Sequence, residues 1–350
     1  MISSTWGPDS LLGAQPDLPR RVAEALPSDE FRVLMALHPN ICSHHSSWQL
    51  AEYLSDCERA GVHIPGDVDE WRAGIVASDV TIGDQGSVTF YSAALGNPLL
   101  MATTPSHTVD PRSPIAQLMT AAPRLGAGDD IADQIRRAIA EHDVTRYSAV
   151  TALTSSEPDH SATIVRSAMY RTLRLPEAPE PAEISALPLP PRPIAGSDSH
   201  LVFVEPAGDQ AATVTRFPAG RLFNNPDTPR GGHLAIGTRE PRRRWIELAD
   251  VIIGHCGPDT DHWISETLSG LPGCAVASAP TTQGHWLLGD HTEHLLRVAG
   301  TEPGCRLFAS VAYQRLRQRA DLRELTGDWT IMCAGRKLRV EVTQASRAAR

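Results

Sequence analysis

One stretch, residues 77–98 (ASDVTIGDQGSVTFYSAALGNP), constrains the fold of this chain more than any other. Val80 and Ile82 lie among small and β-branched residues, which is typical of a short buried strand. A glycine-rich turn follows at residues 83–87, and residues 88–95 read as a helix that stops at a glycine. A strand, a turn and a helix in this order bring free backbone N–H groups and the positive end of the helix dipole to the turn. The stretch therefore predicts a β-α unit with a phosphate seat, formed by the turn and the first residues of the helix.

Two residues of the turn suit a phosphate ligand. Gly86 would let the backbone come close to the ligand, and Ser87 would cap the helix or donate to a phosphate oxygen. A single glycine-rich turn is a weak motif, and the same residues also fit an ordinary strand-to-helix connection in which Ser87 is only a cap. The turn by itself leaves both interpretations open.

Composition excludes several classes of protein. The 350 residues, 41% hydrophobic and 21% charged, suffice for two domains with a sizeable core. The formal net charge of −9 argues against a nucleic-acid partner, since nonspecific nucleic-acid binding needs clustered Lys and Arg. We find neither an apolar run long enough to cross a bilayer nor an N-terminal signal segment, so we expect no integral membrane protein. The six cysteines are scattered without a CxxC motif, which favours free thiols and a cytoplasmic location.

The first part of the chain, residues 1–145, alternates strand and helix. Apolar runs predict strands, and amphipathic spacing predicts helices. The expected strands are 31–37, 62–64, 80–82 and 99–102; the expected helices are 17–26, 47–60, 68–77, 88–95, 115–119 and 131–142. This alternation predicts a Rossmann-like, doubly wound parallel sheet. Ligands bind such sheets beyond the carboxyl ends of the strands, so Ser4, Thr5, His38 and the phosphate seat are expected to face one crevice.

The pattern changes after residue 145. Residues 146–197 hold a predicted helix at 162–173 and a proline-rich linker at 175–194. The remainder, residues 198–350, has hairpin patterns at 201–216 and 329–342, further strands, and helices at 263–268 and 305–320. We expect a mixed α+β domain with antiparallel strands there.

Four short motifs, taken in order, resemble a known family over roughly residues 1–105. They are HP at residues 38–39, SD at 78–79, DQGS at 84–87 and GNP at 96–98. In this order they are similar to the nucleotide-binding, C-terminal half of CDP-glycerol glycerophosphotransferases and related GT-B transferases. The longer strings SSTWGP, LHPN, GDQGSVTFYSAALG and NPLL resemble uncharacterised actinobacterial proteins labelled translation initiation factor 2-like. The GTPase motif GxxxxGK(S/T) is absent from the sequence, so that label carries no mechanistic weight here.

The resemblance implies a site for a nucleotide-activated donor, CDP- or UDP-linked. His38 would contact the diphosphate, and Ser87 with the N–H groups of Gly86 and Val88 would cradle the phosphates. The helix N-terminus and the histidine would stabilise the charge of the leaving diphosphate without a metal. The candidate donor-binding residues are Ser4, Thr5, His38, Asp84, Gly86, Ser87, Val88 and Thr89. No catalytic residue, metal or cofactor is assigned.

The chain departs from the family in two ways. The family's Tyr-Ser-Ser is Gln85-Gly86-Ser87 here, which replaces one hydroxyl with a glycine. Compared with the family, the sequence begins at the strand that opens the second domain, which leaves three interpretations: a misassigned or truncated start, a half-enzyme whose partner supplies the acceptor domain, or a protein that has lost catalysis. One reading is a transferase that moves a glycosyl or polyol-phosphate group. The alternative is a noncatalytic nucleotide-binding or scaffold protein, derived from a transferase, that acts through its C-terminal domain.

Other polar clusters carry weaker signals. Cys42, His44 and His45 suggest zinc ligands, but no second cluster has matching spacing, so a polar loop beside the crevice is the preferred interpretation. Residues 255–262 and 285–294 are rich in His and Asp and fit metal binding, acid–base chemistry or solvated loops.

Overall fold

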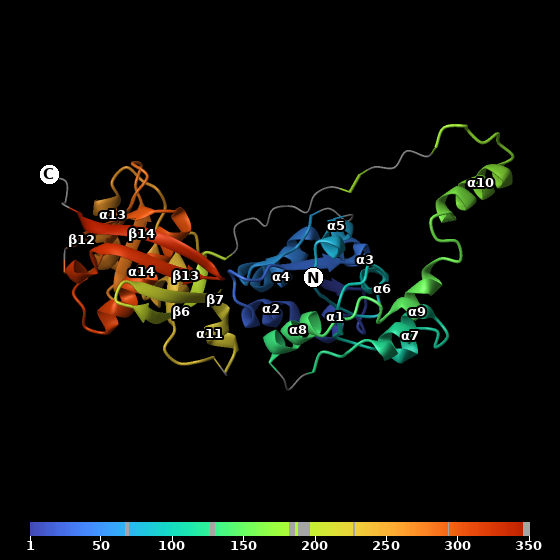
Figure 1. The fold of residues 1–350 in the computed structure, drawn as a ribbon, viewed down its shortest axis with the longest axis horizontal. Coiled ribbons are helices and arrows are strands. Elements are labelled where there is room, and N and C mark those ends of the chain that lie inside the picture. Colours follow the sequence, from blue (N-terminus) through green and yellow to red (C-terminus); the bar gives the residue numbers. More distant parts are fainter. Residues whose placement is uncertain are drawn as a thin grey trace. The chain divides into compact units, whose positions relative to one another are not determined.

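The computed structural model describes residues 1–66, 70–126, 130–181, 186–187, 197–226, 228–292 and 294–345. The chain divides into two compact units, which we describe separately (Figure 1). Unit 1 comprises Met1–Val22, Val33–Ser55 and Val62–Ile194. Unit 2 comprises Ala23–Arg32, Asp56–Gly61 and Ala195–Arg350. The two short segments from the first 61 residues therefore belong with unit 2, whereas the sequence pattern groups them with the first domain.

Unit 1 is built on a five-stranded sheet in the order β3-β2-β1-β4-β5, and every neighbouring pair is parallel. The strands are β1 (Ile2–Ser4), β2 (Val33–Leu37), β3 (Val62–His63), β4 (Thr81–Gly83) and β5 (Leu99–Met101). Ile2 in the central strand pairs with Met35 on one side and Ile82 on the other, and all three are at most 2% exposed. Apolar side chains fill these positions because helices cover a parallel sheet on both faces.

Helices connect the strands of unit 1, as the predicted alternation requires. They are α1 (Leu11–Ala14), α2 (Leu18–Ala25), α3 (Pro39–His44), α4 (Ser47–Arg59), α5 (Glu70–Val76), α6 (Ser87–Ala94), α7 (Pro114–Ala121), α8 (Ile131–Ala140), α9 (Ser148–Thr151) and α10 (Ser161–Leu173), with 3-10 turns at Ser106–Thr108 and Ala152–Thr154. The sequence predicted all except α1, α3 and α9, which are only four to six residues long. The start of the helix expected at 68–77, and most of the proline-rich linker at 175–194, lie outside the described residues.

Unit 2 is a closed barrel in the order β10-β11-β12-β14-β13-β7-β6-β8-β9. Its strands are β6 (Ser199–Gly208), β7 (Ala211–Pro218), β8 (His233–Gly237), β9 (Val251–Ile253), β10 (Val276–Pro280), β11 (Trp286–Gly289), β12 (Leu295–Gly300), β13 (Gly327–Cys333) and β14 (Arg336–Ala345). The predicted hairpins are present as β6–β7 and β13–β14. The expectation of a mixed α+β domain with antiparallel strands did not include β12 or the closure of the barrel. Closure depends on parallel pairs such as β7 with β13, whose residues lie more than a hundred positions apart.

One helix, α14 (Glu302–Arg317), runs through the interior of this barrel. It contacts seven of the nine strands, and its residues from Gly304 to Ala312 are buried except for Arg306. A helix that is buried on all sides needs apolar or small residues all round, and this segment has them (GCRLFASVA). The other helices of unit 2 are α11 (Gly220–Asn224), α12 (Arg243–Glu247) and α13 (Thr260–Gly270), with a 3-10 turn at Leu322–Leu325. No helix in the described part of the chain is long and apolar enough to cross a membrane.

Candidate functional site

The strand order of unit 1 fixes where a ligand site is expected. From β1 the chain goes to β2 and β3 on one side, then returns to add β4 and β5 on the other. The carboxyl ends of β1 and β4 therefore flank the point where the strand order reverses, which is where doubly wound sheets bind ligands. The predicted residues Thr5 and Asp84 follow these two strands directly. Thr5 N donates to Asp84 Oδ2 over 2.8 Å, so the structure brings the two loops together.

Asp84 is the centre of this arrangement. Its Oδ2 accepts hydrogen bonds from the backbone N–H groups of Thr5 and Leu11, each 2.8 Å long, and its Oδ1 accepts one from Gly86 N over 2.9 Å. The side chain is completely buried. Burial raises the pKa of Asp84, and the three backbone N–H groups oppose that rise. Asp84 therefore holds the loops after β1 and β4 in place, and its engaged oxygens do not face a ligand.

Ser4 and Thr89 also shape the site from inside. Ser4 Oγ donates to Thr5 O over 2.9 Å and accepts from Leu12 N over 3.0 Å. Thr89 is fully buried, and a Cβ added to Gly83 would lie only 2.2 Å from its Oγ1. Gly83 thus allows α6 to pack directly on β4. Ser4 thus fixes the backbone of the crevice, whereas Thr89 packs against Gly83 and its buried Oγ1 has no hydrogen-bond partner among the described residues.

The phosphate seat is the N-terminus of α6. Gly86 is the N-cap and supplies no side-chain cap, a property that α6 shares with the later helices α9 to α14. Ser87 is exposed as the first helical residue. The Gly86 N–H, expected in the phosphate cradle, is instead satisfied by Asp84 Oδ1. The groups left to meet an anion are the N–H groups of Ser87 and Val88 and the Ser87 hydroxyl.

Gly86 is required for a steric reason. Its φ of −72° is open to any residue, so backbone freedom is not the explanation. An added Cβ would come within 3.0 Å of Asp84 Oδ1 and 3.3 Å of Thr5 Cβ. A larger residue would push apart the two loops that Asp84 joins.

His38 follows β2, the neighbour of β1, at the same edge of the sheet. Its Nδ1 accepts a hydrogen bond from Asn40 N over 3.1 Å and thereby caps α3. An accepting Nδ1 places the proton of the neutral ring on Nε2, which is then the donor that faces outward from this cap. The His38 ring centroid lies 6.5 Å from that of Trp6, which is half-exposed and stacks on His44 at 5.8 Å.

A cavity of about 450 Å³ adjoins this edge. Its lining comes from the loop and helix after β1 and from the two helices after β2: Gly7, Pro8, Ser10, Leu12, Gly13, Ile41, His45, Gln49, Leu50 and Tyr53. No Asp, Glu, Lys or Arg lies among these residues, and the volume suits a small organic ligand. This cavity was not predicted from the sequence; of the aromatic residues on α4, Tyr53 lines it and is 56% exposed.

The suggested metal ligands do not assemble. Within the part of the chain that the structure describes, no group of three or more His, Cys, Asp and Glu is arranged to hold a metal ion. His44 stacks on Trp6, and Cys42 is exposed. In unit 2, His262 pairs with Glu266 one helical turn away, and the His291 ring shares a hydrogen bond with Cys274 O.

Comparisons with known proteins assign no family to this chain. No family model, curated protein or solved structure matches it. The geometry described above is therefore what bears on function.

Proposed function

We propose that unit 1 binds a nucleotide diphosphate at the carboxyl edge of its sheet. The observation that carries this proposal is the N-terminus of α6, which no side chain caps and which begins at the reversal of strand order. A diphosphate there accepts hydrogen bonds from the N–H groups of Ser87 and Val88 and benefits from the helix dipole. The His38 Nε2–H adds a donor from the neighbouring strand.

The neighbouring cavity supports an uncharged group on the same ligand. Its lining offers apolar and aromatic surface with one amide and one imidazole, and it holds no carboxylate that would repel a phosphate attached to that group. A nucleoside or a sugar matches this chemistry, because both combine a flat or apolar face with neutral hydroxyl and amide-like groups. The cavity and the α6 N-terminus together support a nucleotide-linked donor whose two parts bind at one edge of the sheet.

We propose, further, that the bound nucleotide is a CDP- or UDP-linked donor and that the protein is GT-B-like, transferring a glycosyl or polyol-phosphate group. In such a transfer the bond from the donor group to the diphosphate breaks, and negative charge grows on the departing diphosphate. The α6 N-terminus and His38 would stabilise that charge. The carboxylate at the switch point, Asp84, is fully engaged by backbone N–H groups and is unsuited to act as a base. The base would then come from another residue or from a partner protein that supplies the acceptor domain.

The engaged Asp84 equally favours a noncatalytic alternative, in which unit 1 binds a nucleotide and unit 2 acts as a scaffold. Titration calorimetry with the full chain separates binding from no binding: CDP and UDP should bind more tightly than cytidine and uridine, because the diphosphate makes the contacts with α6. Replacing His38 with glutamine should weaken the binding of CDP and UDP and leave the binding of cytidine and uridine unchanged. If no nucleotide binds at millimolar concentration, the proposal fails. Release of CDP or UDP from a bound donor on adding an acceptor would favour the transferase.

A further inference from the structure

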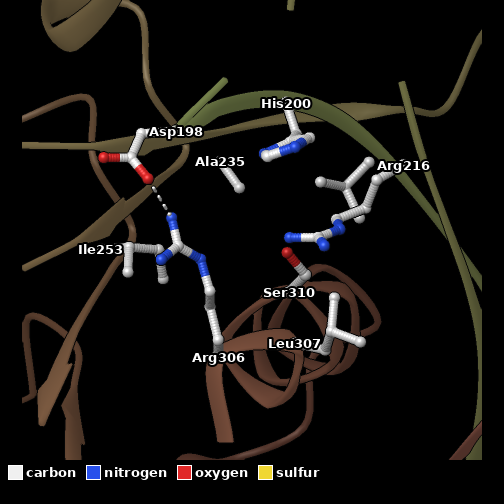
Figure 2. Close-up of a pocket in the computed structure, with 9 residues that line it drawn as sticks. Asp198, His200, Arg216, Ala235, Ile253, Arg306, Leu307 and Ser310 are labelled. Carbon is white, nitrogen blue, oxygen red and sulfur yellow. Dashed lines mark hydrogen bonds and ion pairs between the residues drawn. The ribbon is translucent and has the colours of Figure 1, made fainter. Parts of the chain in front are cut away.

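A second polar site lies inside the barrel of unit 2, far in sequence from the phosphate seat. A partly open cavity of about 10 Å³, about the size of one water molecule, is lined by residues of β6, β7, β8, β9 and α14 and by Asp198. Figure 2 shows His200, Arg216, Arg306 and Ser310 around this space, with Arg306 joined to Asp198. The remaining walls are apolar and come from Val202, Ala235, Ile253 and Leu307.

Both arginines keep donors available for the cavity. Arg216 uses Nε and Nη2 in a two-point pair with Asp29, at 2.8 and 2.5 Å, where Asp29 belongs to the 23–32 segment of unit 2. Arg306 uses Nη2 to donate to Asp198 Oδ1 over 3.0 Å. Among the described residues, the Nη1 groups of both arginines have no hydrogen-bond acceptor. A guanidinium carries five N–H donors, so each has unused donors beside the space.

Two neutral side chains add donors without partners. His200 is 7% exposed and Ser310 is 3% exposed, and both line the cavity. Neither side chain has a hydrogen-bond partner among the residues that the structure describes. Because buried polar groups are nearly always hydrogen-bonded, these unpaired groups indicate that a water molecule or an ion binds in the cavity.

The side-chain groups that face the cavity favour an anion over water, because most of them are hydrogen-bond donors. The cluster holds three guanidinium groups, Arg216, Arg306 and Arg239, and two carboxylates, Asp29 and Asp198. Asp198 lines the cavity, but its two oxygens are taken by Arg306 and Arg239, so its charge is already compensated. Arg239 is 61% exposed and solvent screens its charge, so the two partly buried arginines balance the two aspartates, and the groups left to face the cavity are hydrogen-bond donors.

The pKa of His200 responds to the same charged groups. Burial lowers the pKa of His200 well below its ordinary value, and the next two causes are Arg216 and Arg306, which outweigh the opposite effect of the aspartates. The exposed Glu302 also acts on Arg216, but solvent screens a charge at the surface. At the position of His200, the two arginines therefore outweigh the two aspartates.

We propose that this cavity binds one monovalent anion, chloride in ordinary buffers. The ion would accept hydrogen bonds from Arg216, Arg306, Ser310 and the N–H of neutral His200. It would thereby tie β6 and β7 to α14, the helix at the centre of the barrel. Larger oxyanions such as sulfate or phosphate exceed the volume.

The test measures thermal unfolding of the full chain at constant ionic strength while sodium gluconate is exchanged for sodium chloride. The unfolding temperature of unit 2 should rise by about 2–4 °C and saturate, because an ion that binds only the folded state stabilises it in proportion to its occupancy. Bromide should act like chloride, and crystals grown in bromide should show one anomalous peak in the cavity. Equal unfolding temperatures in chloride and gluconate, with no bromide peak, would show that water fills the space and would overturn the proposal.

A matched pair of variants tests the location. Ser310→Ala removes one donor to the ion with almost no change in shape, and it should abolish most of the chloride-dependent rise. Ser278→Ala is the control, since Ser278 is also fully buried in the barrel but donates to Leu287 O. That control should lower the unfolding temperature in both salts and keep the chloride-dependent rise. If Ser310→Ala keeps the full rise, the anion acts elsewhere and the assignment is wrong.

Discussion

Replacing Asp84 with asparagine tests the centre of the candidate site. In the protein, Asp84 Oδ2 accepts from two N–H groups and Oδ1 accepts from a third. An asparagine side chain has one acceptor oxygen only, so its NH₂ group must face either Gly86 N or the pair formed by Thr5 N and Leu11 N. Whichever orientation it takes, at least one buried N–H meets another donor at hydrogen-bonding distance.

The expected loss follows from these contacts. A buried donor left without an acceptor costs about 1–3 kcal/mol, and hydrogen bonds to a charged acceptor contribute about 1.5–3 kcal/mol each. Asparagine also removes the penalty of burying a charge, the same burial that raises the pKa of Asp84. The two effects oppose each other, and we expect a net loss of about 2 kcal/mol in the free energy of unfolding of unit 1, because the donor-to-donor contact is enclosed.

Urea unfolding of the full chain measures this loss. With a denaturant dependence of about 2 kcal/mol per M, the midpoint of the unit 1 transition should fall by about 1 M. Asp130→Asn is the control: Asp130 caps α8 at an exposed position, where asparagine caps as well as aspartate, so the midpoint should hardly change. An unchanged midpoint for Asp84→Asn would mean that the three N–H groups do not depend on the carboxylate, and the account of the crevice would be wrong.

Two further predictions concern the phosphate seat and the barrel. Ser87→Glu places a negative charge beside the α6 N-terminus, which suits the helix dipole but repels a diphosphate, so the affinity for CDP should fall about tenfold or more while the stability stays unchanged. Ser161→Glu is the control, because Ser161 is the exposed first residue of α10, and this variant should keep the affinity for CDP. Equal affinities of the two variants for CDP would refute the phosphate seat. His233 is buried with both ring nitrogens unpartnered, and burial lowers its pKa to about 3. Between about pH 6.5 and pH 3, His233 is therefore protonated in the unfolded chain and neutral in the folded chain. Acidification through this range should lower the free energy of unfolding by up to about 1.4 kcal/mol per pH unit. In urea titrations, His233→Leu should make the free energy of unfolding depend less on pH. His255→Leu changes an exposed histidine and should leave the pH dependence as it is, so a weaker dependence in that variant would contradict the assignment.

The parallel sheet of unit 1 was predictable because its signals are local. Apolar runs such as residues 33–37 and the strand-turn-helix pattern around residue 86 each depend on neighbours a few positions away, and the strands and longer helices appear where the sequence indicated them. The edge that carries Thr5, His38 and Ser87 also follows from the pattern, because parallel strands joined by helices all end at one edge. These three residues remain the predicted ligand contacts, and binding experiments decide between ligand and loop roles.

The roles of individual side chains at that edge were not predictable. Asp84 looks like a ligand-binding residue in the sequence, yet its oxygens accept from N–H groups 79, 73 and 2 residues away. Only the folded chain brings Leu11 and Thr5 to it. The cavity between the helices after β1 and β2 arises in the same way, since its two walls come from separate segments that no local pattern connects.

The sequence by itself determined the β-α alternation, the carboxyl edge of the sheet and the two hairpins of unit 2, because short-range hydrophobic period and turn residues specify them. The tertiary structure alone decided the closure of the barrel, the passage of α14 through it and the charged cavity beside Ser310. Each of these requires pairing between distant segments, such as Ala211 with Thr330 in β7 and β13, or Asp29 with Arg216. Hydrophobic pattern specifies which face of an element is buried, but the partner that buries it is chosen by the packing of the whole chain.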